Sequence, residues 1–288
     1  MPAFNQVHPF LFEHLDIRGA IVSLDDAWRS LVADRGYPVA VARVLGEMSA
    51  VTTLISANLK QPGRMTFQLR GAGPVNLLVL DCDEQLRLRG MAQWNAAAIQ
   101  EQQSVPDLLG HGQLALTLDA AAMRQPYQSL VPLEGDSVAA IFEHYLTQSE
   151  QQPTRLALAA GPKRAVGLFL QKLPEADQRD ADGWNRIQHL LATVKDEEML
   201  TLEPLELLRR LFPEEDIRVF DPRPVTHHCP KDWEKVSNLV RGLGREECDA
   251  ILREHGELVI RDDICNHDYH LDGPTLAALF ATPSPTLH

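Results

Sequence analysis

The sequence has few basic residues for its length and a clear excess of acidic ones. Its 288 residues include 27 lysines and arginines against 40 aspartates and glutamates, which gives a formal net charge of -13. Binding to nucleic-acid phosphates needs a concentrated basic surface, so we expect no nucleic-acid partner. A net charge this far from zero suits a protein that stays soluble while it binds an aggregation-prone partner.

Long hydrophobic runs and targeting signals are also scarce. No apolar run is expected to approach the roughly 20 residues that a membrane helix needs. The N-terminus, MPAFNQVHPF, lacks a basic region followed by an apolar stretch, and so does not match a signal peptide. We therefore expect a cytoplasmic protein without a membrane partner.

Cysteines are few, and the motifs of common enzymes are absent. In a cytosolic chain, four cysteines are better explained as thiols, metal ligands or redox groups than as structural disulfides. Cys82 lies among acidic residues, and Cys248 lies at helical spacing from Ile251 and Leu252, so both are expected to be inert. There is no nucleophile elbow, kinase signature or metalloprotease motif. We expect a protein that is not an enzyme.

Hydrophobic residues make up 44% of the chain, enough for a packed core. Strands and helices are interspersed without a regular βαβ rhythm, which predicts an α+β fold. Helices are expected over residues 25–36, 38–60 and 135–152, with Ser23 or Asp25 capping the first and Asp136 or Ser137 the last. The apolar residues of the second helix recur at helical spacing and predict one buried face: Leu45, Met48, Thr52, Ile55 and Leu59.

A polar stretch after Pro174, EADQRDADG, marks a boundary. We expect an N-terminal sheet-and-helix domain over 1–174, an amphipathic helical linker over 175–224 that packs on it, and a small C-terminal domain over 225–288. The linker has two apolar stripes, Trp184, Ile187, Leu190, Leu191 and Val194, then Leu205, Leu208 and Leu211. These stripes either belong to the core or form a cover over a binding surface.

The C-terminal segment contains what resembles half of a metal site. Cys229 lies in VTHHCPKDW and Cys265 in RDDICNHDYH, so each arm offers one thiol where a structural zinc site usually draws four ligands in two close pairs. His227 or His228 could complete the first arm, and Asp262 or His267 the second. The alternative is a set of polar loop residues with two incidental cysteines. A domain of about sixty residues has marginal stability as an independent fold unless a disulfide or a bound metal cross-links it.

Several longer motifs resemble the Hsp33 family of redox-regulated holdase chaperones, also called 33 kDa chaperonins. They include DIRGAIVSL, YPVAVARVLGEM, LKQPGRMTFQLRGAGPVNLLV, LEGDSVAAIFEHYLTQSEQQPTRL, KDEEMLTLEPLELLRRLFPEEDIRVFDPRPV and EECDAILREHGELVIRDDICNHDYHLD. The resemblance implies a cytosolic, ATP-independent chaperone that binds unfolding proteins, is activated by oxidation and dimerises when active. It also implies a C-terminal redox domain of zinc-ribbon type. The alternative is a zinc-ribbon-type regulatory or adaptor protein without chaperone activity.

The sequence departs from the family at the zinc ligands. The family pattern, Cys-x-Cys followed by Cys-x-x-Cys, falls here on Cys229, Lys231, Asp262 and Cys265. A protonated lysine cannot bind zinc, so the two replacements argue against a tight zinc site. We predict that no four-thiolate site forms, that Cys229 and Cys265 still lie close together as the redox pair, and that Lys231 and Asp262 can form an ion pair in place of the missing sulfurs.

Overall fold

The structure is a computed structural model, and it describes residues 5–59, 61–100 and 103–281. The chain forms two compact units, residues 1–228 and residues 229–288. The helices of the expected linker belong to the first unit. The functional division at residues 174 and 224 stays a prediction.

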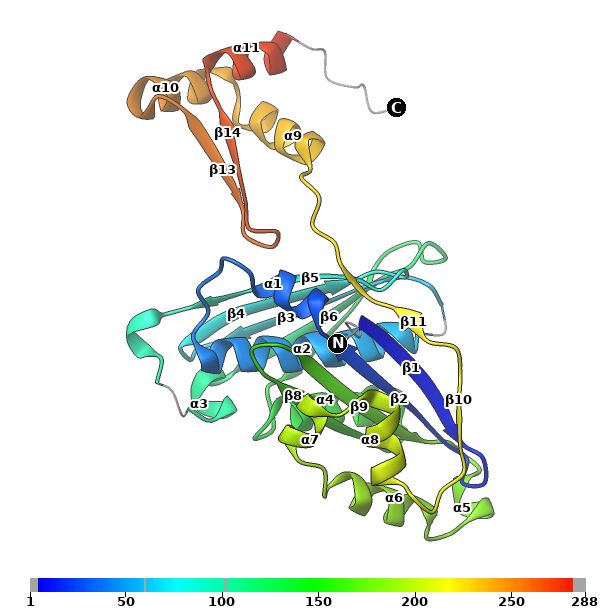
Figure 1. The fold of residues 1–288 in the computed structure, drawn as a ribbon. Helices are drawn as coiled ribbons and strands as arrows, with labels where there is room; N and C mark the ends of the chain where they lie inside the picture. The colour runs from blue at the N-terminus through cyan, green and yellow to red at the C-terminus, as the bar shows by residue number, and fades with distance from the viewer. Residues whose placement is uncertain (1–4, 60, 101–102, 282–288) are drawn as a thin grey trace. The chain divides into compact units, whose positions relative to one another are not determined.

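The first unit contains two sheets (Figure 1). One has the strand order β10 (Ile217–Val219), β1 (Asn5–Phe12), β2 (Ile17–Leu24), β9 (Ala165–Lys172) and β8 (Thr154–Ala160), and β11 (Arg223–Pro224) also pairs with β1. The other has the order β12 (Thr226–His227), β5 (Arg87–Trp94), β4 (Val75–Cys82), β3 (Arg64–Gly71), β6 (Gly112–Asp119) and β7 (Tyr127–Pro132). Together with the helices described below, they confirm the expected α+β class.

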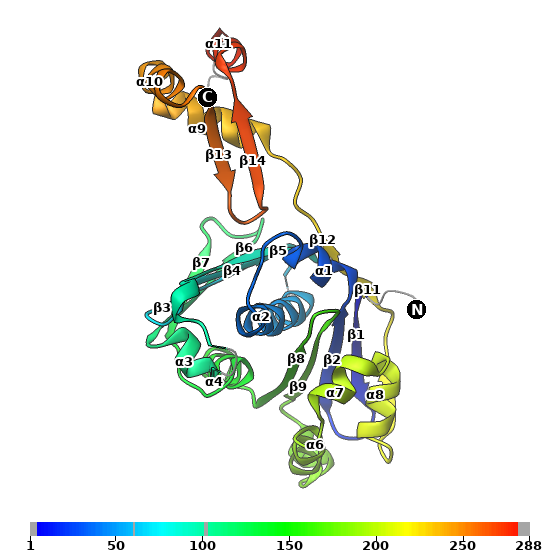
Figure 2. The ribbon, with the colours of Figure 1, turned by 60° about the vertical axis from the view of Figure 1, so that its left-hand side comes forward.

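Helix α2 (Val39–Ala57) runs between the two sheets (Figure 2) and is buried on nearly every side. The prediction of one buried face was wrong, because sheets lie on both sides of the helix and α4 (Val138–Glu150) packs beside it. Gly46 allows a close approach to β8, since a Cβ there would lie 2.5 Å from the Cβ of Ala160. The helix is therefore the centre of the main core.

Among the described residues, α2 is also the one helix long and apolar enough to cross a membrane by length and composition, and 78% of its most apolar window is buried inside the structure. The expectation that no apolar run approaches the length of a span was therefore wrong. Burial between two sheets gives this apolar helix a place in the core of the first unit.

The first unit also contains two short helices, α1 (Asp26–Val32) and α3 (Val105–Leu109). The N-terminal caps of α1 and α4 can be compared with the predicted ones. Neither Ser23 nor Asp25 caps α1. Instead, the side-chain oxygen of Asn5 accepts hydrogen bonds from the backbone N–H groups of Asp25 and Ala27, both at 2.9 Å. The cap predicted for α4 is confirmed, since Ser137 accepts from the N–H of Ala140 at 3.1 Å.

Four short helices follow β9: α5 (Ala176–Arg179), α6 (Gly183–Leu191), α7 (Asp196–Thr201) and α8 (Pro204–Leu211). The chain then runs along both sheets as β10, β11 and β12. Strands β10 and β11 pair with β1, and β12 pairs in parallel with β5. These three short strands connect the helical segment to the start of the second unit.

In its described residues, the second unit contains α9 (Trp233–Leu243), α10 (Arg245–His255), α11 (Gly273–Ala281) and a hairpin of β13 (Leu258–Asp262) and β14 (His267–Leu271). The core is small and consists of Val236, Val240, Cys248, Leu258, Tyr269, Leu271 and Leu276. A unit with so few large buried side chains depends on additional cross-links for its stability, such as a disulfide or a bound metal.

Candidate functional site

The face of the β1–β2–β9–β8 sheet that points away from α2 carries a continuous apolar surface. Its buried residues are Phe10, Phe12, Ile17, Ile21, Ala159, Val166, Leu168 and Leu170. They arise from the alternation of each strand, which sends every second side chain to this face. On an uncovered sheet this surface would be open to solvent.

The helices α6, α7 and α8 cover that surface with their own apolar stripes. Of the predicted linker residues, Ile187 and Leu208 are fully buried in this cluster, at 0% and 2% exposed, while Trp184, Leu190 and Leu205 pack at its margin. The sequence analysis missed Met199, Leu207 and Phe212, which are all buried here. Leu208 and Leu211 lie in the buried stripe of α8 as predicted, whereas Leu205 is only partly buried and Pro204 and Leu207 complete the stripe.

The covering helices are also held by polar contacts at their outer edge. Arg186 on α6 donates from Nε to Glu215 at 2.8 Å and from a terminal nitrogen to Asp180 at 3.1 Å. Both carboxylates lie in the segments that flank α6–α8. These ion pairs fix the ends of the helical segment, while the apolar stripe holds its middle.

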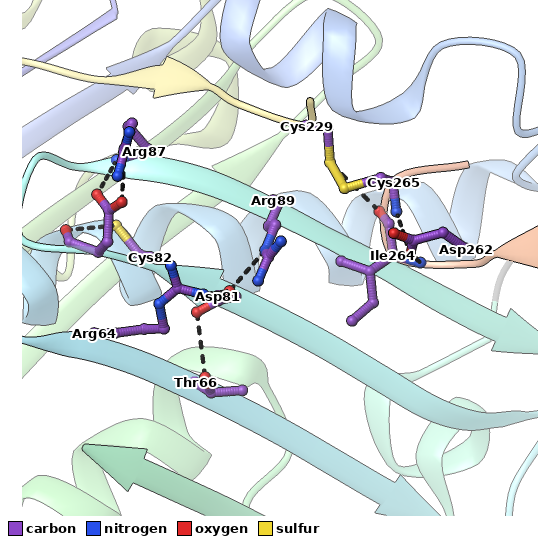
Figure 3. A network of polar contacts seen from close by, with 11 residues as sticks. Arg64, Thr66, Asp81, Cys82, Arg87, Arg89, Cys229, Asp262, Ile264 and Cys265 are labelled. Atoms are coloured by element: carbon purple, nitrogen blue, oxygen red, sulfur yellow. Dashed lines mark hydrogen bonds and ion pairs between the residues drawn. A yellow bond between two sulfur atoms is a disulfide. The ribbon is translucent and has the colours of Figure 1, made fainter. Parts of the chain in front are cut away.

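In the second unit, Cys229 and Cys265 form a disulfide (Figure 3). Their Cα atoms are 5.2 Å apart although 36 residues separate them in sequence. Cys265 is buried at 6% exposed, and Cys229 is half-buried. The structure therefore brings together the two cysteines that the sequence singled out, across the turn of the β13–β14 hairpin.

Asp262 stabilises that turn through its carboxylate. Its Oδ1 accepts the backbone N–H groups of Ile264 and Cys265, at 3.1 and 3.2 Å (Figure 3). Asn266, further along the turn, has a left-handed backbone with φ of 55°. Asp262 thus orients the backbone that carries Cys265.

The predicted ion pair between Lys231 and Asp262 is wrong. Within the described part of the chain no ion pair joins them; the ammonium of Lys231 lies 5.7 Å from the centre of the Tyr269 ring, as in a cation–π contact. Asp262 is occupied by the turn amides instead. Opposite charge alone did not determine the contacts of these two side chains.

The predicted histidines are used in other ways. Nε2 of His267 lies 2.7 Å from the carbonyl oxygen of Cys229, so this nitrogen carries the proton that it donates. His227 belongs to β12 of the first unit, and the backbone N–H of His228 donates to the carbonyl of Leu88 at 3.1 Å. Among the described histidines of the second unit, His267 is the one that hydrogen-bonds to the backbone of the cysteine pair.

These residues do not fit a zinc ion. Zinc needs four free donors in a tetrahedral arrangement, but the two sulfurs are bonded to each other, Asp262 Oδ1 accepts two amides, and His267 Nε2 donates to a carbonyl. Across residues 5–59, 61–100 and 103–281, no group of three or more His, Cys, Asp or Glu residues is placed to hold a metal. The family's four-ligand site is not reproduced in this geometry.

The other two cysteines are buried thiols. Burial raises the pKa of Cys82 to about 12, a hydrogen bond from Ser56 opposes this in part, and the charges of Asp83 and Asp81 add to it. Burial also raises the pKa of Cys248, and the nearby charge of Asp249 adds to it. Both thiols are therefore kept protonated at neutral pH, and neither is a candidate nucleophile.

A second polar cluster lies on the other sheet (Figure 3). Asp81 on β4 is 6% exposed; it accepts a hydrogen bond from Thr66 at 3.2 Å and pairs with Arg64 at 3.2 Å and Arg89 at 2.7 Å. Each partner lies on a neighbouring strand, β3 or β5. The cluster therefore ties three strands together, which explains a buried carboxylate without a catalytic role.

Comparison with known proteins places the chain in a family. Residues 5–272 match the model of the Hsp33 protein family. The 33 kDa chaperonin of Methylobacillus flagellatus is 40% identical over 284 residues, which cover 98% of this chain and 96% of that protein. The 33 kDa chaperonin of Nitrosococcus oceani is 40% identical over 276 residues, 96% and 94% of the two chains. The chain is thus of the chaperone class and not an enzyme.

This chain belongs to the Hsp33 family, as its motifs indicated. A solved structure supports the fold: the crystal structure of the 33 kDa chaperonin (heat shock protein 33 homolog) of Thermotoga maritima matches with a TM-score of 0.80. The two are 21% identical, and the match covers 96% of this chain and 98% of that one. The α+β arrangement is therefore shared.

Proposed function

We propose that this protein is an ATP-independent holdase that binds unfolding proteins through the apolar sheet face beneath α6–α8. The observation that carries the proposal is this face itself: a row of large side chains on β1, β2 and β9, covered by a segment that comes later in the chain. Once the cover is displaced, this face becomes an exposed apolar patch, and such patches are typical protein-binding sites. Membership of a chaperone family supports the same conclusion.

The covering helices are suited to moving because they are short. Helices α6, α7 and α8 contain 9, 6 and 8 residues, and isolated helices below about 12 residues are marginal in water. Their order therefore depends on the apolar stripe that faces the sheet. A loss of that contact releases the segment and exposes the sheet face in a single step.

The proposal includes unfolded proteins as partners, a cytoplasmic location and a homodimer in the active form. It also includes redox control through Cys229 and Cys265. Zinc is not part of it, because the residues around the cysteine pair do not fit a four-ligand site. No observation favours the alternative, a zinc-ribbon-type regulatory or adaptor protein.

The test is suppression of aggregation without nucleotide. A chemically denatured client is diluted into buffer with the full-length protein, reduced or oxidised, and light scattering is followed. We expect scattering to fall as the protein approaches equimolar amounts in at least one redox state. Unchanged scattering at several-fold excess in both states would overturn the proposal.

A further inference from the structure

The disulfide joins two parts of the second unit that lie far apart in sequence. Cys229 precedes α9, and Cys265 lies in the hairpin turn between β13 and β14. We infer that oxidation of this pair closes and stabilises the second unit, and that reduction loosens it without a metal taking over. This is a response of opposite sign to the zinc release that the family resemblance implies, and it does not depend on the proposed holdase activity.

The contacts near the bond fasten one short segment to the hairpin. Apart from the disulfide, residues 229–233 are held by the hydrogen bond from His267 to the carbonyl of Cys229, and by the hydroxyl of Tyr269, which accepts the N–H of Asp232 at 2.8 Å. Trp233 packs edge-on against Tyr269 with ring centres 4.9 Å apart. All of these contacts need the segment to lie against β14, and the disulfide is the covalent link that keeps it there.

The unit has little else to compensate for loss of that link. Its core is small, and Trp233, Leu239, Leu243 and Val259 are between 46% and 54% exposed. Opening the disulfide frees a loop of 36 residues. On the chain-entropy model, closing a loop of this size shifts the folding equilibrium by roughly 600-fold.

A metal cannot replace the link in the reduced protein. Two free thiols would remain, but the positions of the other two family ligands hold Lys231, whose ammonium cannot coordinate, and Asp262, which accepts the turn amides. Asp262 could offer only a carboxylate oxygen, a harder ligand than the thiolate it replaces, and Nε2 of His267 donates to the carbonyl of Cys229, so any site built here would bind zinc more weakly than four thiolates. The reduced second unit is therefore expected to stay loose whether or not zinc is present.

A peroxide can oxidise the cysteine pair, and a dithiol can reduce it again. In oxidation by a peroxide, the two thiols lose two electrons and two protons, the S–S bond forms, and hydrogen peroxide becomes two waters. In reduction by a dithiol, a thiolate attacks the more accessible sulfur of Cys229, and Cys265 leaves as thiolate. The second thiol of the reductant then displaces Cys229 and forms the reductant's own disulfide.

The experiment is hydrogen exchange with mass spectrometry on the full-length protein, oxidised with peroxide or reduced with dithiothreitol, each with added zinc chloride or chelator. Peptides from 229–281 should exchange up to roughly 600-fold faster after reduction, on the chain-entropy model, and zinc should not restore protection. Peptides from the first-unit core, such as those of α2, serve as the internal control. The double variant Cys229→Ser, Cys265→Ser should exchange fast under every condition.

Two results would overturn the inference. One is a second unit that is better protected when reduced, with one tightly held zinc per chain by metal analysis. The other is equal protection in the oxidised and reduced states, which would show that the disulfide contributes nothing. Neither result depends on client binding, so a failed holdase assay and a failed exchange experiment are separate outcomes.

Discussion

Arg164 forms a two-point ion pair with Asp25, at 2.8 and 3.0 Å, and its third nitrogen donates to the carbonyl of Leu202 at 3.0 Å. Arg164 and Asp25 are nearly buried, at 13% and 14% side-chain exposure. Arg164 lies in the turn between β8 and β9, Asp25 precedes α1, and Leu202 lies between α7 and α8. One guanidinium therefore connects the sheet domain to the covering helices.

Loss of this guanidinium should loosen the covering helices. We expect Arg164→Gln to destabilise the first unit by roughly 2–4 kcal/mol, because it leaves the carboxylate of Asp25 without its charge partner. Hydrogen exchange in residues 196–212 should rise, and aggregation suppression should increase. Lys163→Gln, on the neighbouring exposed residue, is the matched control. Equal exchange in both variants would show that Arg164 does not hold the cover.

The buried stripe of α8 provides the direct test of the covering role. Leu207→Asp with Leu208→Asp places two carboxylates in the apolar cluster, where both leucines are at most 3% exposed. Each lost leucine should cost about 2–5 kcal/mol. If the helices cover a client surface, holdase activity should rise as the thermal midpoint of the covering segment falls.

Arg209→Asp on the exposed face of the same helix is the control and should leave both measurements nearly unchanged. A lower thermal midpoint for the leucine variant without any gain in holdase activity would show that these side chains are core and nothing more.

Thiol labelling should separate the two kinds of cysteine. Cys82 and Cys248 are each 0% exposed with a raised pKa, so both should stay unmodified by iodoacetamide in the oxidised protein, and Cys82, in the first unit, should stay unmodified after reduction as well. Cys229 and Cys265 should become reactive only after a dithiol opens their bond. Peptide mapping by mass spectrometry gives the four positions separately. Rapid labelling of Cys82 in the folded protein would contradict the buried position assigned to it.

Glu47 on α2 should make the first unit more stable at acid pH. Burial raises its pKa to about 7; the charge of Arg43 opposes this, and that of Asp196 on α7 adds to it. Because the folded-state pKa exceeds the ordinary value of 4.5, this contribution is fully present below about pH 4.5 and is lost as pH rises through about 7.

We therefore expect Glu47→Gln to raise the thermal midpoint at pH 8, by an amount equivalent to roughly 1–3 kcal/mol, and to change it little at pH 5. Glu84→Gln, at an exposed position, makes the same charge change and should have no such pH dependence. The same gain at both pH values would show that removal of the ionised form is not the cause.

The sequence by itself determined the class of fold, most elements of the first unit and the family. Local patterns were sufficient for α1, α2 and the start of α4, because helical spacing and a serine cap act between near neighbours. The long motifs were enough to identify the Hsp33 family. Both kinds of information are contained in short stretches of chain.

Tertiary structure decided the features that depend on distant residues. Helical spacing suggested one buried face for α2, but two sheets from separate parts of the chain enclose it. Asn5 caps α1 because pairing of β1 with β2 places it opposite Leu24, next to the start of that helix. Nothing within twenty residues in sequence could show this.

The proximity of Cys229 and Cys265 also depends on the tertiary structure. The 36-residue spacing of Cys229 and Cys265 is compatible with many arrangements, and the β13–β14 turn, stabilised by Asp262, brings them together. The same turn removed Asp262 from the ion pair that its charge suggested, since its carboxylate was already satisfied by backbone amides. Charge and spacing limit which partners are available, but the path of the folded backbone decides which of them come within bonding distance.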